Sequence, residues 1–278
     1  MIHVLKGMLR PGKVWLRFVY WNSRGWFPWR DKRVYAPRGA HLMREVAYFG
    51  GYEPAVLEAL RVFARPGTVV IDVGANLGLV SLDVLKSSPE VMVHAYEPSS
   101  NSLSHLRKTV TESGYGKRWC LHEVACADRP GSADFHMSSP ALGAFDGLAV
   151  SGRVPMASSV QVKLVRLDDE WKGWFKPPVS VIKIDVEGAE GRVCAGMYEL
   201  IAACRPVIIM EWNLVNLEAN GADPFELFRI AERHGFKVYD PEALIHVTSL
   251  YLVRLLLSRG RDTFLLIPQE MMTHGDGV

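Results

Sequence analysis

From residue 52 onward, short runs rich in β-branched residues alternate with stretches that have helical spacing of apolar residues. Strands separated by helices of about 10–15 residues are typical of βαβ units, which build parallel sheets covered by helices. We therefore predict an α/β fold with a mostly parallel, doubly wound sheet. The expected strands are residues 68–72, 91–96, 119–124, 133–137, 160–165, 179–184, 207–210, 238–239 and 263–267. The expected helices are 53–64, 77–86, 99–113, 189–203 and 224–234, and residues 138–159, rich in Ser, Gly, Ala and Pro, are expected to form a long loop.

In sheets of this kind, ligands bind outside the carboxyl ends of the strands. The first expected strand runs into the turn DVGANLG at residues 72–78, which leads into a helix. This is not the GxGxxG pattern of dinucleotide-binding proteins, and the acid before the turn suits a cationic ligand better than a pyrophosphate. Glu97 ends the second strand, where an acid accepts both hydroxyls of a ribose. Together, the turn and Glu97 predict a nucleoside ligand that carries an ammonium and a sulfonium.

Five segments resemble the FkbM family of class I S-adenosylmethionine-dependent methyltransferases. They are TVVIDVGANLGLVSL at 68–82, AYEPS at 95–99, VACADRPG at 124–131, VRLDDEW at 165–171 and VIKIDVEGAE at 181–190. The resemblance covers residues 52–268 and is most specific where IDVGAN and IKIDVEGAE occur together. It implies a Rossmann-like methyltransferase sheet with an antiparallel strand near the C-terminus. It also implies methyl transfer from S-adenosyl-L-methionine, most often to a hydroxyl of a natural product or sugar.

The resemblance assigns expected roles to individual residues. Residues of the glycine turn would line the methionine end of the cofactor, Glu97 would bind its ribose, and residues 124–128 would lie near adenine. Glu53, before the first strand, would also reach the cofactor. The positions expected to bind S-adenosyl-L-methionine are Glu53, Asp72, Gly74, Asn76, Gly78, Glu97, Ala125, Asp128 and Asp185.

Acidic residues follow two further strands. Asp185 ends the run VSVIKI and is followed by Glu187 and Glu190, while Glu211 ends VIIM and Asn213 comes two residues later. Because parallel strands end at one edge of a sheet, we expect Asp185 and Glu211 to face one crevice. Carboxylate and amide oxygens suit Mg²⁺ or Mn²⁺, so the predicted metal ligands are Asp185, Glu211 and Asn213. Glu190 also fits a helix N-terminal acid favoured by the dipole.

Methyl transfer to a hydroxyl needs a base or a metal-bound alkoxide, because a neutral hydroxyl is a poor nucleophile. The candidate catalytic groups are Asp185, Glu187, Glu211 and His246. Asp185 is equally suited to contacting the charged end of the cofactor, and a lone histidine such as His246 is more often structural. Lys183, within its strand, either faces solvent or contacts the acceptor.

Two other functions fit the same residues. N-methylation of an amine-bearing natural product needs deprotonation of an ammonium rather than a metal. A non-catalytic cofactor-binding protein would keep the glycine turn but have a degenerate acceptor side, and the acids at positions 185, 187 and 211 argue against this. We therefore expect an O-methyltransferase with a small-molecule acceptor.

Residues 1–50 differ in character from the methyltransferase-like domain expected at residues 51–278. Residues 1–35 carry eight Lys/Arg and one acid, interleaved with aromatic residues that include four Trp. Such a segment either contacts a membrane surface, an anionic partner or the acceptor, or packs its aromatics against the main domain with its charges in water. We predict that it covers the acceptor crevice or forms a homodimer contact.

Charge and cysteine content restrict the remaining possibilities. The chain has 32 Lys/Arg and 30 Asp/Glu, a balance that does not favour nucleic acid as the acceptor. Its apolar runs are too short for a transmembrane segment, and its N-terminus lacks the apolar stretch of a secretory signal. The four Cys form no CxxC pair. We expect reduced thiols and a cytoplasmic location.

Overall fold

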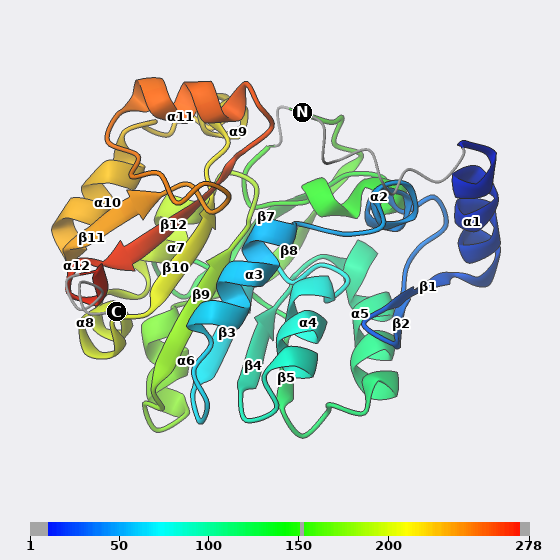
Figure 1. The fold of residues 1–278 in the computed structure, drawn as a ribbon, viewed down its shortest axis with the longest axis horizontal. Coiled ribbons are helices and arrows are strands. Elements are labelled where there is room, and N and C mark those ends of the chain that lie inside the picture. The colour runs from blue at the N-terminus through cyan, green and yellow to red at the C-terminus, as the bar shows by residue number, and fades with distance from the viewer. Residues whose placement is uncertain (1–10, 151–152, 273–278) are drawn as a thin grey trace.

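A seven-stranded sheet forms the centre of the protein (Figure 1). The computed structural model describes residues 11–150 and 153–272. The strand order is β11-β12-β10-β9-β3-β4-β5; β12 is antiparallel to both of its neighbours, and the other adjacent pairs are parallel. This confirms the predicted mostly parallel sheet with an antiparallel strand near the C-terminus. The strands are β3 (Val69–Val73), β4 (Met92–Tyr96), β5 (Trp119–His122), β9 (Val179–Ile184), β10 (Val207–Glu211), β11 (Phe236–Tyr239) and β12 (Thr263–Pro268).

Helices cover both faces of the sheet, because successive strand residues point to opposite sides. Val70, Val181 and Ile209 pack in one buried cluster, which includes residues of α2 to α5. Their neighbours Ile71 and Ile182 pack in a second cluster, which includes residues of α6 to α11. The helices are α2 (His41–Phe49), α3 (Pro54–Phe63), α4 (Leu79–Ser87), α5 (Ser100–Ser113), α6 (Leu167–Gly173), α7 (Glu190–Ala195), α8 (Tyr198–Cys204), α9 (Leu214–Ala219), α10 (Glu226–His234), α11 (Leu250–Leu257) and α12 (Gln269–Met272). Within the described ranges, no helix is both long and apolar enough to cross a membrane.

The N-terminal segment forms a helix and a hairpin that pack against the sheet domain. Helix α1 (Pro11–Arg24) leads into strands β1 (Trp26–Trp29) and β2 (Lys32–Tyr35), which pair antiparallel. The hairpin was not predicted. Its two turn residues, Arg30 and Asp31, have positive φ angles of 49° and 62°, as the type I′ turn of a tight hairpin requires, but neither is the glycine that usually signals this turn.

Two further elements differ from the sequence-based prediction. The expected long loop at 138–159 contains a 3₁₀ helix, η2 (Pro140–Phe145), and its end belongs to strand β8 (Ser158–Val165). β8 pairs with β7 (Gly131–Met137) and β6 (Ala125–Cys126) in a small second sheet. The expected helix at 189–203 is divided into α7 and α8. The division includes Gly196, where a Cβ would lie 2.2 Å from the carbonyl oxygen of Ala127.

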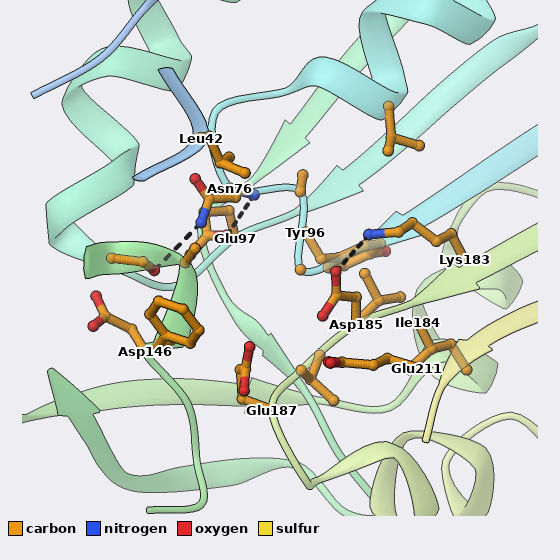
Figure 2. Close-up of a pocket in the computed structure, with 18 of the residues that line it drawn as sticks. Leu42, Asn76, Tyr96, Glu97, Asp146, Lys183, Ile184, Asp185, Glu187 and Glu211 are labelled. Atoms are coloured by element: carbon orange, nitrogen blue, oxygen red, sulfur yellow. Dashed lines mark hydrogen bonds and ion pairs between the residues drawn. The ribbon is translucent and has the colours of Figure 1, made fainter. Parts of the chain in front are cut away.

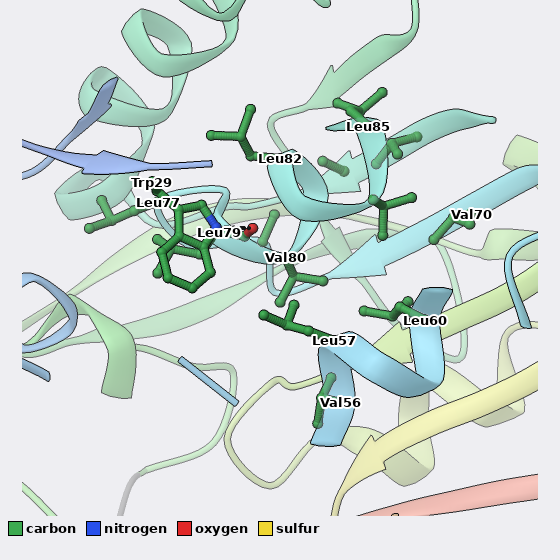
Figure 3. Close-up of a cluster of buried hydrophobic side chains, with 14 of the residues drawn as sticks. Trp29, Val56, Leu57, Leu60, Val70, Leu77, Leu79, Val80, Leu82 and Leu85 are labelled. Carbon is green, nitrogen blue, oxygen red and sulfur yellow. Dashed lines mark hydrogen bonds between the residues drawn. The ribbon is translucent and has the colours of Figure 1, made fainter. Parts of the chain in front are cut away.

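Trp29 connects the hairpin to the core and should contribute strongly to stability. Its side chain is 7% exposed, and its indole N–H donates to the carbonyl oxygen of Leu79 at 2.9 Å (Figure 3). We expect Trp29→Ala to lower the free energy of unfolding by about 3–5 kcal/mol, because a large buried ring is removed. Trp15→Ala, at an exposed position on α1, is the control and should cost less than about 0.5 kcal/mol. Equal urea midpoints for the two variants would show that the hairpin is not part of the folded core.

Candidate functional site

A cavity opens at the carboxyl ends of the central strands β3, β4, β9 and β10 (Figure 2). Its lining includes the glycine turn after β3, Glu97 after β4, and the acids that follow β9 and β10. Helix α2, residues 124–126 and η2 supply the remaining walls. The lining includes His41, Leu42, Glu45, Glu53, Gly74, Asn76, Glu97, Ala125, Phe145, Asp146, Arg153, Lys183, Asp185, Glu187 and Glu211.

Gly74 lets strands β3 and β9 approach closely at the edge of the cavity. It has φ +85°, and a Cβ there would lie 1.8 Å from the carbonyl oxygen of Asp185. The N–H groups of Gly74 and Ala75 both donate to the carbonyl of Tyr96 at 3.0 Å, and the N–H of Asp185 donates to that of Val73. The turn is therefore fixed to both neighbouring strands, and a side chain at position 74 would block the approach.

Glu97 is held in the cavity floor by backbone donors. Its Oε2 accepts the N–H of Asn76 at 2.7 Å, and its Oε1 accepts the N–H of Ser99 at 2.7 Å. Asn76 adopts a left-handed φ of 49°, which turns its N–H toward Glu97, and its side chain donates to the carbonyl of Gly143 in η2. Burial raises the pKa of Glu97 to about 7, although the two N–H donors act to lower it. Each carboxylate oxygen retains a lone pair with which to accept a ligand hydroxyl.

Asp72 lies behind the cavity wall. It is fully buried, and its Oδ2 accepts the hydroxyl of Ser81 at 2.6 Å. Burial raises its pKa, while nearby Lys183 acts to lower it. Lys183 does not face solvent, since it is 4% exposed; it lines the edge of the cavity and donates to Oδ2 of Asp185 at 2.8 Å. Asp72 therefore supports the site from below rather than lining it.

Three carboxylates meet on the opposite side of the cavity. Oxygen atoms of Asp185, Glu187 and Glu211 lie within 4.8 Å of one another. Arg153 bridges two of them: its Nη2 donates to Oε1 of Glu187 at 2.6 Å and to Oε1 of Glu211 at 3.2 Å. With Lys183 on Asp185, two cations already neutralise much of the negative charge of this acid cluster (Asp185, Glu187 and Glu211).

The acid cluster divides its protons unequally. Burial raises the pKa of Glu211 well above its usual value, and the charge of Asp185 adds to this. Burial also raises the pKa of Glu187, to about 7, with Asp185 again contributing. Burial acts the same way on Asp185, but Lys183, a hydrogen bond with Glu211 and the charge of Arg153 together hold the pKa of Asp185 below its usual value. Near neutral pH, Asp185 is therefore an anion, and Glu187 is poised between its two protonation states.

The oxygen-only donor set suits Mg²⁺ or Mn²⁺, but the positions of the cationic side chains compete with a metal ion. An ion held by Glu187 and Glu211 would stand where the guanidinium of Arg153 contacts both. Asp185 and Glu211 come together as predicted for a metal site, but Asn213 does not join them. Its side chain accepts the N–H of Val215 as the N-cap of α9. As arranged here, the acid cluster is neutralised by arginine and lysine, so it does not fit a divalent cation without a movement of Arg153.

Parts of the sequence are shared with known proteins. Residues 72–238 match the Methyltransferase FkbM domain. The chain belongs to the FkbM methyltransferase family. It is 28% identical over 165 residues to 2-O-methyltransferase NoeI of Sinorhizobium fredii (strain NBRC 101917 / NGR234), covering 53% of this chain and 65% of that protein. It is 29% identical over 159 residues to 31-O-demethyl-FK506 methyltransferase FkbM of Streptomyces tacrolimicus, covering 48% and 60%. The matches span less than two thirds of either relative.

Solved structures superpose on this FkbM-family chain at low identity. A methyltransferase FkbM from Methylobacillus flagellatus KT gives a TM-score of 0.44 at 11% identity, covering 90% of this chain and 58% of that one. An O-methyltransferase from Bacillus cereus in complex with SAH gives 0.43 at 14% identity, covering 78% and 81%. The family assignment depends on the sequence match and not on these superpositions.

The structure does not bring every predicted site residue to the cavity. Gly78 is the N-cap of α4 and packs against Leu106 and Trp119, where a Cβ would lie 2.8 Å from each side chain. Asp128 points away and forms an ion pair with Arg192 at 2.9 Å. His246 is exposed on the loop after β11, where its backbone bridges to Tyr239. Glu190 accepts the N–H groups of Gly188 and Val186 at the start of α7, as expected for a helix N-terminal acid.

Two cavity residues were missed in the sequence, although a signal was present. Asp146 and Arg153 are the charged residues of the otherwise uncharged stretch 138–159. Asp146 accepts the hydroxyl of Ser99 and the N–H of Ser138, both at 2.6 Å, and so ties this stretch to the start of α5. Isolated charges in a long uncharged segment indicate fixed partners, and here the partners surround the cavity.

The stability cost of crowding Asp185 at position 74 can be measured separately from the cost of a left-handed backbone conformation. Gly67 has a similar φ of +73° but open space around it, so Gly67→Ala should cost about 1–2 kcal/mol of stability from the left-handed conformation alone. We expect Gly74→Ala to cost clearly more, because the added methyl must also displace the backbone of Asp185, just after β9. Urea denaturation of both variants measures the difference. Equal costs would mean that the contact with Asp185 does not constrain the site.

Proposed function

We propose that this protein is an S-adenosyl-L-methionine-dependent methyltransferase that methylates a hydroxyl of a small-molecule natural product or sugar. The observation that carries the proposal is one cavity that joins the glycine turn and Glu97 on one side to the acid cluster on the other. The first side has the features of a nucleoside site, and the second has groups that can manage a proton. The names of its relatives, a 2-O-methyltransferase and a 31-O-demethyl-FK506 methyltransferase, support an oxygen acceptor.

The chain's own residues fit the cofactor. The ribose hydroxyls would donate to Glu97, whose carboxylate is already oriented by two N–H groups. Ala125 borders the cavity where adenine would lie. At the methionine end, Asp185 is an anion, and Oε2 of Glu53 is buried with no hydrogen-bond partner among the described residues. These two acids would receive the ammonium group. The cofactor, when bound, supplies an already activated methyl group.

Proton removal from the acceptor hydroxyl is assigned to Glu187. It lines the cavity, and its carboxylate is oriented by Arg153 and by the side-chain amide of Asn216 at 2.7 Å. A carboxylate whose pKa is raised to about 7 is a stronger base than an ordinary one and is still partly ionised at neutral pH. Asp185 then acts as a fixed anion beside it, and Mg²⁺ or Mn²⁺ is not needed for this step.

The N-terminal segment is assigned to covering the acceptor. Helix α2 contributes His41, Leu42 and Glu45 to the cavity wall, and Phe145 of η2 stacks against His41 with ring centroids 5.3 Å apart. The acceptor would therefore bind between this wall and the acid cluster. A cytoplasmic location belongs to the same proposal.

Cofactor binding provides the first test of the proposed function. We expect calorimetry to give a Kd on the order of micromolar for S-adenosylmethionine or S-adenosylhomocysteine. Glu97→Gln should weaken binding by about ten-fold or more, because an acceptor of the ribose hydroxyls is replaced by an amide. Glu123→Gln, which removes the charge of an exposed acid paired with Arg107, is the matched control. Thermal unfolding of each variant excludes misfolding, and wild-type affinity in Glu97→Gln would contradict the ribose role.

The pH profile tests the assignment of the base. Because Glu187 must be ionised to accept a proton, kcat at saturating cofactor should rise as pH increases through about 7 and then level off. Glu187→Gln should lower kcat by about 10²–10⁴ with little change in cofactor affinity. Glu218→Gln, on the exposed side of α9, is the control. The acceptor is any sugar or polyketide alcohol that supports turnover in a screen.

The same assay decides the role of a metal. Turnover that survives EDTA agrees with an acid cluster neutralised by Arg153 and Lys183. Loss of turnover that Mn²⁺ restores would assign the cluster to a metal ion instead, and would remove the base role from Glu187.

A further inference from the structure

The outward side of α1 is apolar and aromatic, whereas a surface helix normally turns polar side chains to water. Val14 and Trp21 are buried against the rest of the protein. The side chains at positions 15, 16, 19 and 20 form an exposed stripe with helical spacing. They are Trp15 (56% exposed), Leu16 (60%), Val19 (40%) and Tyr20 (54%). Two of the four are aromatic, so this stripe (the α1 stripe) is not an ordinary solvent face.

Basic side chains surround the α1 stripe and rest on its aromatic neighbours. The guanidinium of Arg24 lies 4.7 Å from the ring centroids of both Tyr20 and Trp26, and that of Arg33 lies 4.9 Å from Trp26. Lys13 is exposed at the start of the helix. No acidic residue occurs in α1. Cations and rings are thus presented together, with the flank of α1 at one edge of the molecule (Figure 1).

Charge is distributed very unevenly along the chain. Residues 1–35 have eight Lys/Arg and one acid, whereas the rest of the chain has 24 Lys/Arg and 29 Asp/Glu. The α1 stripe therefore sits in a strongly basic segment of a molecule that is otherwise acidic. An anionic surface is complementary to this segment. A second copy meeting it face to face would bring two such basic segments together.

We propose that α1 docks on the surface of a membrane that contains anionic lipid. Trp and Tyr favour the headgroup level of a bilayer, Leu and Val favour its apolar boundary, and Lys and Arg are attracted by anionic headgroups. The α1 stripe presents all three kinds of side chain on one flank. Because α1 packs against α2, whose residues line the cavity, docking holds the cavity close to the membrane surface. This surface is distinct from the site of methyl transfer.

Vesicle co-sedimentation of the full chain tests the proposal. The probes are vesicles of phosphatidylcholine alone and of phosphatidylcholine with about one third phosphatidylglycerol. We expect binding to the anionic vesicles, loss of binding in high salt, and little binding to the neutral ones. The variant Trp15→Ser/Leu16→Ser/Tyr20→Ser should bind about ten-fold more weakly or worse, and Lys13→Glu/Arg24→Glu should reduce binding similarly.

A matched variant controls for general surface hydrophobicity. Val62→Ser/Phe175→Ser/Tyr251→Ser also removes three exposed apolar side chains, but elsewhere on the molecule, and should bind as the wild type does. Equal binding by the α1 variant and this control would overturn the proposal. So would a dimer, seen by light scattering, that only the α1 variant abolishes, because the stripe would then be an interface between copies. Cofactor affinity, measured in parallel, reports separately on the proposed function.

Discussion

The buried ammonium of Lys183 is the group on which the arrangement of the site depends. It lies within the central strand β9, pairs across the sheet with Asp72 on β3, and donates to Asp185 at the end of its own strand. Burial alone would lower the pKa of Lys183, but Asp185, Glu53 and Asp72 raise it above its usual value. One permanent cation therefore allows three acids to occupy the same low-dielectric region. Without it, these carboxylates would repel one another or take up protons.

This cation also separates the two functions of the cavity. Asp185 stays ionised because it contacts Lys183 directly, whereas Glu187 and Glu211, farther from it, have raised pKa values. A fixed anion suits the binding of a cationic cofactor, while a carboxyl that titrates near neutral pH suits proton transfer. Arg153 then completes the neutralisation from the other side of the cluster. The local electrostatics therefore give chemically similar acids different pKa values, which suit them to different roles.

The sheet and half of the site were accessible from the sequence because they depend on local patterns. β-branched runs predicted the strands, and parallel strands necessarily bring Gly74, Glu97, Asp185 and Glu211 to one edge. The contribution of Arg153 was not predicted, because it comes from a segment with no regular periodicity, and an isolated charge in such a segment does not identify its partners. Lys183 was ambiguous for a related reason: a lysine in a strand is buried only if acids on neighbouring strands compensate for its charge, and strand register is not visible in one sequence. The prediction of Asn213 as a metal ligand neglected its competing capacity as an N-cap.

Acidic and basic side chains lie in different parts of the molecule. Several acids line the cavity, whereas the basic side chains Lys13, Arg24 and Arg33 of α1 and the hairpin do not. The aromatic side chains of α1 and the hairpin fall into two groups. Trp21, Phe27 and Trp29 are buried in the core, while Trp15 and Tyr20 are exposed. Packing explains the first group but not the second, because exposing large rings has no benefit for folding. The proposed docking of α1 on a membrane gives the exposed group a partner, and the basic surroundings of α1 favour one that is negatively charged.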